Sequence, residues 1–375
     1  MLKVAVNGFG RIGRNFLRDS LGNRDLRVLA VNDIADSKTM AHLFKYDSVY
    51  GRFDGEIRAG ENFISVKGNK ILMFSEKDPA NLPWGKLGVD VVIESTGIFR
   101  KKEQAEAHLK AGAKKVVLSA PPKGDKPVKK IVLGVNENTY NPKEDHVISN
   151  ASCTTNCLAP VAKVLDQKFG IVKGFMTTIH AYTSDQRLLD APHKDWRRGR
   201  SAATSIVPTS TGAAKALGEV MPKLKGRITG SAMRVPVADG SIVDLVVELR
   251  RKASVEEINK AFKKASEGKM KGIVQYHEEP IVSLDIIGNP HSAIFDSLLT
   301  NIEGDLIEIF AWYDNEWGYS KRLVELVSFI KKKWRKKDSL SLSIGIIKNL
   351  DIGSSYVLPS HLPCVFVRIF PRLLL

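Results

Sequence analysis

The first 150 residues alternate short runs rich in β-branched residues with amphipathic stretches. The apolar spacing between the runs predicts helices over 11–21 and 104–111. Strands that alternate with helices favour a mostly parallel sheet with helices on both faces. The predicted strands are 2–6, 27–31, 89–94, 115–119, 130–133 and 146–149, and 121–130 is predicted to be a turn-rich loop.

The pattern changes after Ser152. Apolar spacing over 158–169 predicts a helix that Gly170 ends, and long strand-like runs then follow in direct succession. Direct succession of long strands favours a mixed, largely antiparallel sheet. Ser254 and Glu257 form a predicted capping box for a helix that ends at Gly268. The predicted strands are 171–182, 227–237, 242–250, 281–287 and 306–313, and a last helix covers about 319–334.

Length and composition limit the number of domains and the cellular location that are expected. The chain has 375 residues, of which 43% are hydrophobic and 26% charged, so two domains are more likely than one. No apolar run reaches the roughly 18 residues that a membrane helix needs, and the start lacks the pattern of a secretion signal. Three cysteines are too few for a disulfide framework, which agrees with a reducing compartment. We therefore expect a cytoplasmic protein.

A formal net charge of +16 is also found in proteins that bind nucleic acid. Residues 331–375 carry nine Lys or Arg against two Asp, a net of +7, which leaves +9 on residues 1–330. No zinc-finger spacing, aromatic RNA-binding signature or basic zipper accompanies the charge. Nucleic acid is therefore unlikely as the primary partner, whereas a phosphorylated substrate fits a basic body.

A glycine motif follows the first predicted strand. Gly8, Gly10 and Gly13 form G-x-G-x-x-G at the start of a helix. Glycines there allow a tight turn and a close approach to a pyrophosphate, and the helix N-terminus offers free N–H groups. Asp33 follows twenty residues after Gly13, where a carboxylate accepts hydrogen bonds from the ribose hydroxyls of NAD and repels a 2′-phosphate. The motif predicts a Rossmann-type dinucleotide-binding domain.

Two of the three cysteines lie in the stretch NASCTTNCLAP. Zinc needs more ligands than Cys153 and Cys157 provide, so no metal site is predicted. A redox pair more often has C-x-x-C spacing. The remaining interpretation makes Cys153, at the start of a helix, a reactive thiol and Cys157, one turn further in, a packing residue. Such a thiol needs a base, and His180 is a candidate, although a structural histidine is the commoner case.

Several longer motifs are more specific. The chain contains NGFGRIGR, ASCTTNCLAP, HAYTSDQRLLDAPHKDWRRGR, TGAAKALGEVMP, RVPVADGS and AWYDNEWGYS. In this combination and order the sequence resembles phosphorylating glyceraldehyde-3-phosphate dehydrogenase over about residues 1–332. ASCTTN and YDNEWGY are shared only with that family and with erythrose-4-phosphate dehydrogenase, which hydrolyses its acyl enzyme and remains the alternative enzymatic reading.

The resemblance implies a reaction and a set of residues. Glyceraldehyde 3-phosphate, NAD and inorganic phosphate would give 1,3-bisphosphoglycerate through a hemithioacetal and a thioester on Cys153, with His180 as the base. The cofactor would contact Arg11, Ile12, Asp33, Lys77, Ser119 and Asn315 in addition to the three glycines. The substrate phosphate would contact Thr183, Arg198 and Arg234, and the attacking phosphate Ser152, Thr154, Thr211 and Gly212.

The resemblance also implies an organisation. Residues 1–152 would form the NAD-binding domain, residues 153–316 an α+β catalytic domain, and a helix at about 317–334 would pack back on the first domain. The loop from about Tyr182 to Ile206 would contact a neighbouring subunit in a homotetramer. Residues 335–375 lie outside the resemblance and are expected to be a poorly ordered extension and not a membrane anchor, because prolines and arginines interrupt its apolar end.

Two features of the chain leave the choice of cofactor and a secondary binding role open. Ala191 stands where many NAD-selective relatives have Leu, but Asp33 is present, so NAD preference with some tolerance of NADP is expected. The basic surface and tail leave a secondary RNA-binding or surface-binding role open beside the enzymatic one.

Overall fold

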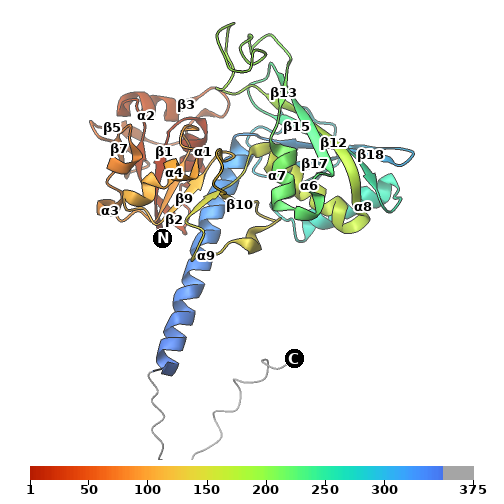
Figure 1. Cartoon of the computed structure of the whole chain (residues 1–375). Coiled ribbons are helices and arrows are strands. Elements are labelled where there is room, and N and C mark those ends of the chain that lie inside the picture. Colours follow the sequence, from red (N-terminus) through yellow and green to blue (C-terminus); the bar gives the residue numbers. More distant parts are fainter. Residues whose placement is uncertain (349–375) are drawn as a thin grey trace, which may run out of the picture. The chain divides into compact units, whose positions relative to one another are not determined.

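The computed structural model describes residues 1–348, with side chains described through residue 334. Residues 1–332 form one compact unit, and a second unit begins at Lys333. The first unit contains two large sheets, which Figure 1 shows as separate bodies with helices against them.

The first sheet has the strand order β10-β11-β9-β8-β1-β2-β7-β6-β5. Its strands from β10 to β7 pair in parallel, and β6 and β5 extend it as an antiparallel edge. A separate pair joins β3 (Tyr46–Asp47) and β4 (Gly51–Arg52). The sheet consists of β1 (Leu2–Asn7), β2 (Leu26–Asn32), β5 (Ile57–Ala59), β6 (Phe63–Val66), β7 (Asn69–Phe74), β8 (Val91–Glu94), β9 (Lys115–Leu118), β10 (Lys129–Lys130) and β11 (Val147–Ser149).

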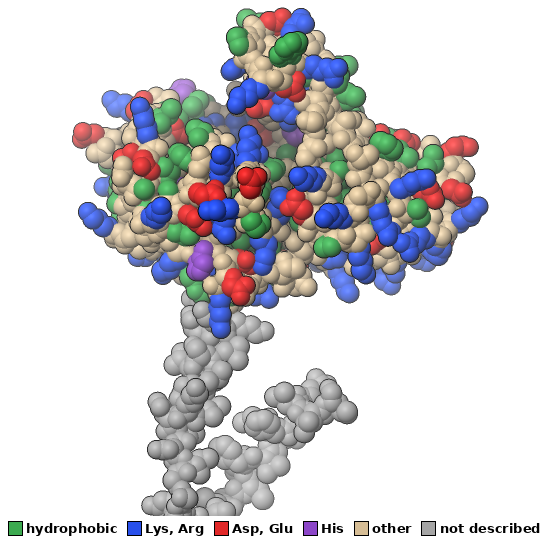
Figure 2. All heavy atoms as spheres, in the orientation of Figure 1, with side chains coloured by type: hydrophobic (Ala, Val, Ile, Leu, Met, Phe, Trp, Pro, Cys, Tyr) green, Lys and Arg blue, Asp and Glu red, His purple; other side chains and the backbone are tan. Residues whose placement is uncertain are grey.

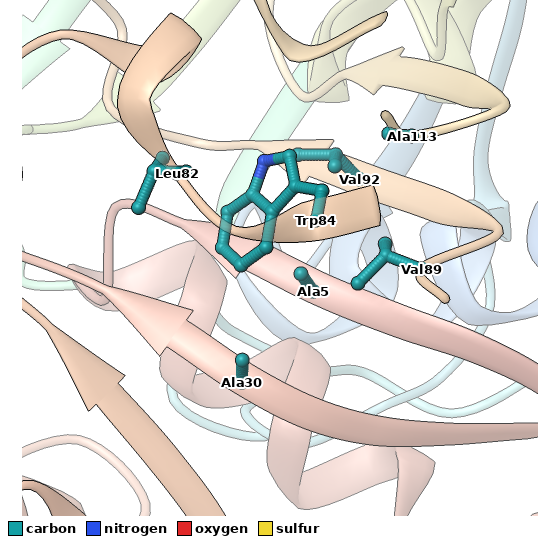
Figure 3. Packing of buried hydrophobic residues seen from close by; sticks show 7 residues of the cluster. All are labelled: Ala5, Ala30, Leu82, Trp84, Val89, Val92 and Ala113. Atoms are coloured by element: carbon teal, nitrogen blue, oxygen red, sulfur yellow. The ribbon is translucent and has the colours of Figure 1, made fainter. Parts of the chain in front are cut away.

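Helices connect the parallel strands, as the alternating pattern predicts. The central parallel strands are mostly apolar, as in β8 (VVIE) and β9 (KVVL), because both faces of a parallel sheet are covered. On one face, Trp84 is fully buried against alanines and valines of the sheet, and Figure 3 shows its indole lying over Ala5 and Ala30. The helices are α1 (Arg11–Ser20), α2 (Ser37–Lys45), α3 (Trp84–Leu87), α4 (Lys102–Ala105) and α5 (Ala107–Lys110), with short 3₁₀ turns at Pro79–Asn81 and Glu137–Thr139.

The second sheet has the order β13-β14-β12-β15-β18-β17-β16. Four of its pairings are antiparallel, whereas β12 with β14 and β16 with β17 are parallel. Helices α6, α7 and α8 pack against its strands. The elements are α6 (Cys153–Phe169), β12 (Ile171–Ala181), β13 (Val207–Ser210), α7 (Ala213–Val220), a 3₁₀ turn (Pro222–Leu224), β14 (Ile228–Val235), β15 (Ser241–Leu249), α8 (Val255–Glu267), β16 (Val274–His277), β17 (Ala293–Glu303) and β18 (Leu306–Tyr313).

The predicted fold class is confirmed: a Rossmann-type parallel sheet is followed by a mixed, largely antiparallel sheet. The predicted capping box at Ser254 is present, since its hydroxyl accepts from the Glu257 N–H and the Glu257 carboxylate accepts from the Ser254 N–H. The strands at 57–74, 274–277 and 293–303 were not predicted, and the strand predicted at 130–133 is only β10.

The strand predicted over 281–287 is wrong. Residues 283–288 form turns that begin shortly after Pro280. The Asp285 carboxylate accepts from the Val282 N–H at 2.7 Å, and Gly288 has φ of +81°. The run does not have the burial of a sheet strand, because Val282 and Leu284 are 60% and 75% exposed and only Ile286 is buried.

The last helix is longer than predicted. Helix α9 (Trp317–Lys348) begins near the predicted start and continues past 334, over a stretch free of proline. Within the first unit, Lys321 contacts Asp19 of α1 at 3.2 Å and Lys331 contacts Asp25 at 2.7 Å. The remainder of the expected extension, residues 349–375, lies outside the described residues.

Candidate active site

Cys153 is the first residue of α6. Ser152 caps this helix, because its hydroxyl accepts from the Thr155 N–H at 3.0 Å. The helix N-terminus therefore lies directly at the Cys153 thiol and favours negative charge there. Cys157 lies one turn further in, is fully buried and donates to the Ala311 carbonyl at 3.6 Å, as expected for a packing residue.

His180 faces the thiol from β12. Its Nε2 lies 3.4 Å from Sγ of Cys153, and its Nδ1 lies 2.7 Å from the Ala181 carbonyl. In the tautomer with its proton on Nδ1, this proton faces the Ala181 carbonyl and Nε2 presents a lone pair to the thiol. The imidazole is only 4% exposed and packs edge-on against the ring of Tyr313. The structure thus brings together the two residues that sequence spacing left as a candidate pair.

Arg234 lies beside His180 because the two are direct partners in the parallel pairing of β14 with β12. Its Nη1 lies 2.7 Å from Nδ1 of His180 and donates to the Ala181 carbonyl at 2.9 Å. Its Nε is buried and has no hydrogen-bond partner among the described residues. A buried N–H without a protein acceptor suits an anionic ligand.

Burial shapes the electrostatics of these three side chains. It lowers the pKa of His180 to about 3, and the nearby Arg234 charge acts in the same direction. Burial also raises the pKa of the Cys153 thiol, while Arg234 opposes that shift. A charge on only one of these two groups, a lone thiolate on Cys153 or a lone imidazolium on His180, is therefore disfavoured. A thiolate and an imidazolium 3.4 Å apart attract each other strongly at low dielectric, so the two groups titrate as a pair.

The glycine motif wraps tightly at the start of α1. Gly8 has φ of +92°, and a Cβ on Gly13 would lie 2.2 Å from the Gly8 carbonyl oxygen. These two glycines hold the helix close to the sheet. Gly10 differs, because no described atom lies within 4 Å of the position of its Cβ. Gly10 therefore leaves open space beside the helix N-terminus, which is the cradle a pyrophosphate requires.

Asp33 lies at the end of β2 next to this cradle. One carboxylate oxygen accepts from the Phe9 N–H at 2.7 Å and the other from the Ala35 N–H at 3.1 Å. Each oxygen retains lone pairs for ribose hydroxyls. The residues at this edge of the sheet thus fit an adenosine dinucleotide.

The other residues expected around the cofactor have mixed surroundings. The Arg11 guanidinium is bound to Asp47 and Glu316. Asn315 is buried, and its Oδ1 accepts from the Ser241 hydroxyl at 2.6 Å. Lys77 is exposed, and Ile12 and Ser119 are partly buried.

The expected phosphate ligands have different surroundings. Arg198 donates through Nε to the Thr209 hydroxyl at 3.0 Å and pairs with Asp185. Thr154 is buried, and its hydroxyl lies 2.9 Å from that of Tyr313. Gly212 is exposed at the start of α7, Thr211 and Ser152 are partly buried, and Thr183 is partly buried after β12.

Tyr313 is the residue that sequence reasoning missed here. Its hydroxyl bridges the Thr154 and Thr178 hydroxyls at 2.9 and 2.8 Å, so it ties α6 to β12 beneath the reactive pair. The motif AWYDNEWGYS contains it, but nothing in that motif indicates which partner the tyrosine contacts.

The described residues contain neither a membrane-spanning helix nor a metal-binding cluster. In residues 1–348, no helix is long and apolar enough to cross a bilayer. In the same part of the chain, no group of three or more His, Cys, Asp or Glu side chains is placed to hold a metal ion.

A Rossmann cradle next to a helix-capped cysteine and a histidine defines an NAD-dependent dehydrogenase that works through a cysteine. Two family models match the chain. Glyceraldehyde 3-phosphate dehydrogenase, NAD binding domain, matches residues 2–102, and glyceraldehyde 3-phosphate dehydrogenase, C-terminal domain, matches residues 152–315.

Similar proteins agree with these models. The chain is 56% identical over 333 residues to glyceraldehyde-3-phosphate dehydrogenase of Geobacillus stearothermophilus, covering 88% of this chain and 99% of that one. It is 58% identical over 332 residues to the Streptomyces coelicolor enzyme, covering 88% and 98%, and 57% identical over 338 residues to that of Mycobacterium tuberculosis, covering 88% and 99%. The chain belongs to the glyceraldehyde-3-phosphate dehydrogenase family, and its activity is the NAD-dependent oxidation of that family.

Proposed function

We propose that Cys153 is the nucleophile of this dehydrogenase and His180 its base. The observation that carries this assignment is the 3.4 Å contact between Sγ and Nε2 at the N-terminus of α6. His180 accepts the thiol proton as sulfur attacks the aldehyde carbon of glyceraldehyde 3-phosphate, and it returns this proton to the resulting alkoxide oxygen. A neutral hemithioacetal on Cys153 and a neutral imidazole result.

The oxidation follows on the same sulfur. NAD, when bound, supplies the acceptor for the hydride that leaves the hemithioacetal carbon. His180 takes the proton of the hemithioacetal hydroxyl, and a thioester remains on Cys153. Inorganic phosphate then attacks the thioester carbon, the carbon–sulfur bond breaks, and 1,3-bisphosphoglycerate leaves.

Two phosphate sites support these steps. Arg198, Arg234 and Thr183 hold the substrate phosphate, since Arg234 offers a buried N–H without a protein acceptor. Ser152, Thr154, Thr211 and Gly212 surround the attacking phosphate with hydroxyl and backbone N–H groups. This arrangement favours phosphorolysis over the hydrolysis of an erythrose-4-phosphate dehydrogenase.

For the cofactor, the assignment covers the glycine motif with Arg11 and Ile12, Asp33, Lys77, Ser119 and Asn315. Asp33 makes NAD the preferred cofactor over NADP, because its carboxylate would lie against a 2′-phosphate. Comparing kcat/KM for the two cofactors tests this preference, and a higher value for NADP would overturn it.

The proposal extends to organisation. Residues 1–152 bind the cofactor, with the start of α9 against them, and residues 153–316 carry the chemistry. A homotetramer is supported by the loop at 183–206, whose apolar side chains are uncovered in the single chain: Leu188, Leu189, Trp196 and Ile206 are 71%, 75%, 85% and 69% exposed. Figure 1 shows this loop projecting beyond β13. A cytoplasmic location accords with free cysteines and the family.

Charge on the surface bears on the alternative of nucleic acid. On the face that Figure 2 shows, lysines and arginines are interspersed with acidic side chains and do not form one basic groove. We therefore keep small phosphorylated molecules as the partners.

One assay tests the function. NAD reduction is measured with glyceraldehyde 3-phosphate, with and without phosphate, for the wild type and for Cys153→Ser. We expect steady turnover only for the wild type with phosphate. Turnover that is independent of phosphate would point to hydrolysis, and an undiminished rate in Cys153→Ser would remove Cys153 from the mechanism.

A further inference from the structure

A single tyrosine hydroxyl lies between two buried carboxyl groups, one of which directly precedes Asn315 in the chain. The hydroxyl oxygen of Tyr50 is 2.6 Å from Oδ2 of Asp239 and 2.9 Å from Oδ1 of Asp314. Asp239 and Asp314 are 2% and 1% exposed. Three distant segments therefore meet here: the turn after β3, the turn before β15 and the segment between β18 and α9.

Proton counting assigns the ionisation of this group. A tyrosine hydroxyl has one hydrogen and can donate to only one of the two carboxyl groups. The second short contact is a hydrogen bond only if that carboxyl is itself protonated and donates to the tyrosine oxygen. Two simultaneous hydrogen bonds at the Tyr50 oxygen therefore need one proton on the acid pair.

The number of backbone hydrogen bonds indicates which of the two carboxyl groups holds the proton. Asp314 accepts three backbone N–H groups, from Glu316, Trp317 and Gly288, at 2.9, 2.6 and 2.7 Å. Asp239 accepts only one, from Gly240 at 2.9 Å. N–H donors stabilise a carboxylate, so the smaller number of backbone donors at Asp239 favours the proton on Asp239. In that state Asp239 donates to Tyr50 and Tyr50 donates to Asp314.

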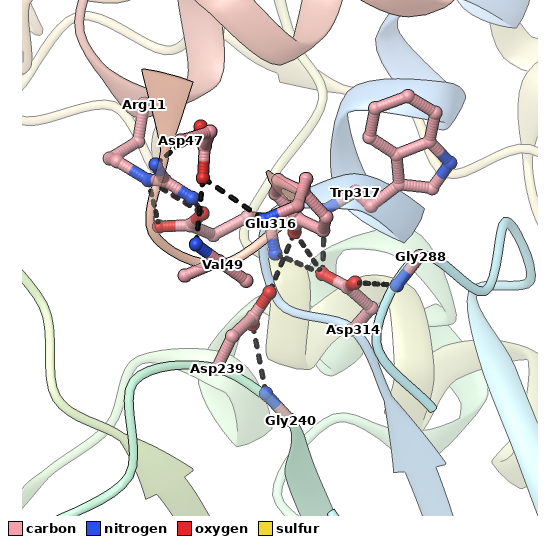
Figure 4. A network of polar contacts seen from close by, with 10 residues as sticks. Arg11, Asp47, Val49, Asp239, Gly240, Gly288, Asp314, Glu316 and Trp317 are labelled. Atoms are coloured by element: carbon pink, nitrogen blue, oxygen red, sulfur yellow. Dashed lines mark hydrogen bonds and ion pairs between the residues drawn. The ribbon is translucent and has the colours of Figure 1, made fainter. Parts of the chain in front are cut away.

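The surrounding charges favour the same state. Burial, with the negative charges of Asp314 and Glu316, raises the pKa of Asp239 to about 9. Figure 4 shows Asp239, Asp314, Glu316, Asp47 and Arg11 gathered in one polar network. The titratable and charged groups facing it are Tyr50 after β3, Asp47 on β3, Arg11, Arg14 and Arg18 on α1, Glu316 before α9, and Cys153 on α6.

The network holds Asn315 in place. Asn315 lies between Asp314, which anchors the start of α9, and Glu316, which Arg11 binds through Nε at 2.8 and 3.0 Å. On its other side, the Ser241 hydroxyl two residues after Asp239 donates to its amide oxygen at 2.6 Å. Loss of the Asp239 proton would place a second negative charge against Asp314. The resulting repulsion would loosen the two contacts that hold Asn315, namely the segment at Asp314 and the hydrogen bond from Ser241. Ionised Asp239 also raises the pKa of the Cys153 thiol.

We propose that Tyr50 and Asp239 are positioning residues: a hydroxyl-bridged acid pair, with its proton on Asp239, fixes the segment that presents Asn315 to the cofactor. The inference rests on the proposed contact of Asn315 with the nicotinamide amide. It makes NAD affinity depend on a proton that no reacting group carries.

The test is NAD affinity of the full chain by calorimetry from pH 6.5 to 10, for the wild type, Asp239→Asn and Tyr50→Phe. Because only the protonated form holds Asn315, wild-type affinity is expected to be level to about pH 8 and to fall by up to about tenfold per pH unit above the pKa. Asp239→Asn keeps a donor to Tyr50 and cannot ionise, so the alkaline fall should disappear. Tyr50→Phe should raise KM for NAD at pH 7 and leave kcat nearly unchanged.

Asp296→Asn is the matched control, since Asp296 is equally buried but accepts from Trp312 Nε1 at 3.0 Å, away from this network. It should keep the wild-type profile. A wild-type affinity that stays level to pH 10, or an alkaline fall that survives in Asp239→Asn, overturns the proposal.

A second measurement does not depend on the variants folding. Infrared titration of the wild type should show one buried protonated carboxyl disappearing between pH 8 and 10, and its absence overturns the proposal. Asn315→Ala tests the role of Asn315 in NAD binding separately from the proton on Asp239. If it leaves NAD affinity at pH 7 unchanged, the assigned role of Asn315 fails, whereas the infrared result still decides whether Asp239 holds the proton.

Discussion

Sγ of Cys153 lies 3.4 Å from Nε2 of His180, although the residues are 27 positions apart and come from a helix and a strand. The Ala181 carbonyl and the ring of Tyr313 fix the imidazole in this position. The base is thus held before substrate arrives, which is the condition for efficient proton transfer from the thiol.

Replacing His180 should therefore slow chemistry more than binding. We expect His180→Asn to lower kcat by about 10²–10⁴-fold, the usual contribution of a general base, with NAD affinity little changed. Steady-state kinetics and NAD titration measure both quantities. A kcat within about threefold of the wild type would contradict the role of His180.

The two cysteines should differ in reactivity. Cys153 lies at a helix N-terminus beside a base, whereas Cys157 is fully buried. Treatment of the native protein with iodoacetamide should label Cys153 first, and activity should disappear in step with that label. Cys157→Ala is the matched control and should retain both activity and labelling. Peptide mass spectrometry identifies the site, and early labelling of Cys157 would contradict the assignment.

Arg234 should support the thiolate as well as the substrate phosphate. Its positive charge lowers the pKa of the Cys153 thiol and the pKa of His180. In Arg234→Ala both pKa values rise, so a smaller fraction of Cys153 is thiolate at pH 7 and alkylation slows. KM for glyceraldehyde 3-phosphate should rise by at least about tenfold, because a buried charged hydrogen bond is lost. Arg234→Lys should recover part of the alkylation rate, and equal rates in the wild type and Arg234→Ala would refute the electrostatic effect.

The sequence predicts this region well wherever the signal is local. The G-x-G-x-x-G spacing and Asp33 lie within one strand–helix–strand unit, and Ser152 caps the helix that Cys153 begins, so short-range rules suffice. Long-range contacts are different. The bond of Thr154 to Tyr313 joins residues 159 positions apart, and the packing of α6 against β18 brings them together.

The errors have a physical cause too. Residues 281–287 lie largely in turns, with Val282 and Leu284 exposed and Ile286 buried, and the hydrophobic pattern alone does not distinguish such a segment from a strand. The guanidinium of Arg11, a predicted cofactor contact, is bound by Glu316, which is 305 positions away. The carboxylates that compete for an arginine are not visible from its neighbours in sequence.

The glycines of the motif should separate folding from cofactor binding. A Cβ at Gly13 would lie 2.2 Å from the Gly8 carbonyl oxygen, so Gly13→Ala must push α1 away from β1 and should cost several kcal/mol, about 3 or more. Gly10→Ala meets no described atom within 4 Å and should change stability by about 1 kcal/mol or less. Its methyl group instead occupies the open space of the cradle, so NAD affinity should fall. Denaturant unfolding and NAD titration check both variants, and a stable Gly13→Ala protein with normal affinity would contradict the packing argument.

The exposed loop at 183–206 should control assembly. Leu188 and Leu189 are more than 70% exposed in the single chain, and water contact with such a patch is unfavourable unless another subunit covers it. Placing two carboxylates there, in Leu188→Glu with Leu189→Glu, should dissociate the tetramer, because buried charges at an interface remain unpaired. Leu306→Glu, at another exposed apolar position outside the loop, is the control and should sediment as the wild type does. Sedimentation velocity reads the outcome directly. Since the same loop carries Arg198, the dissociated variant should also show a raised KM for glyceraldehyde 3-phosphate, and a wild type that sediments as a monomer would end the tetramer proposal.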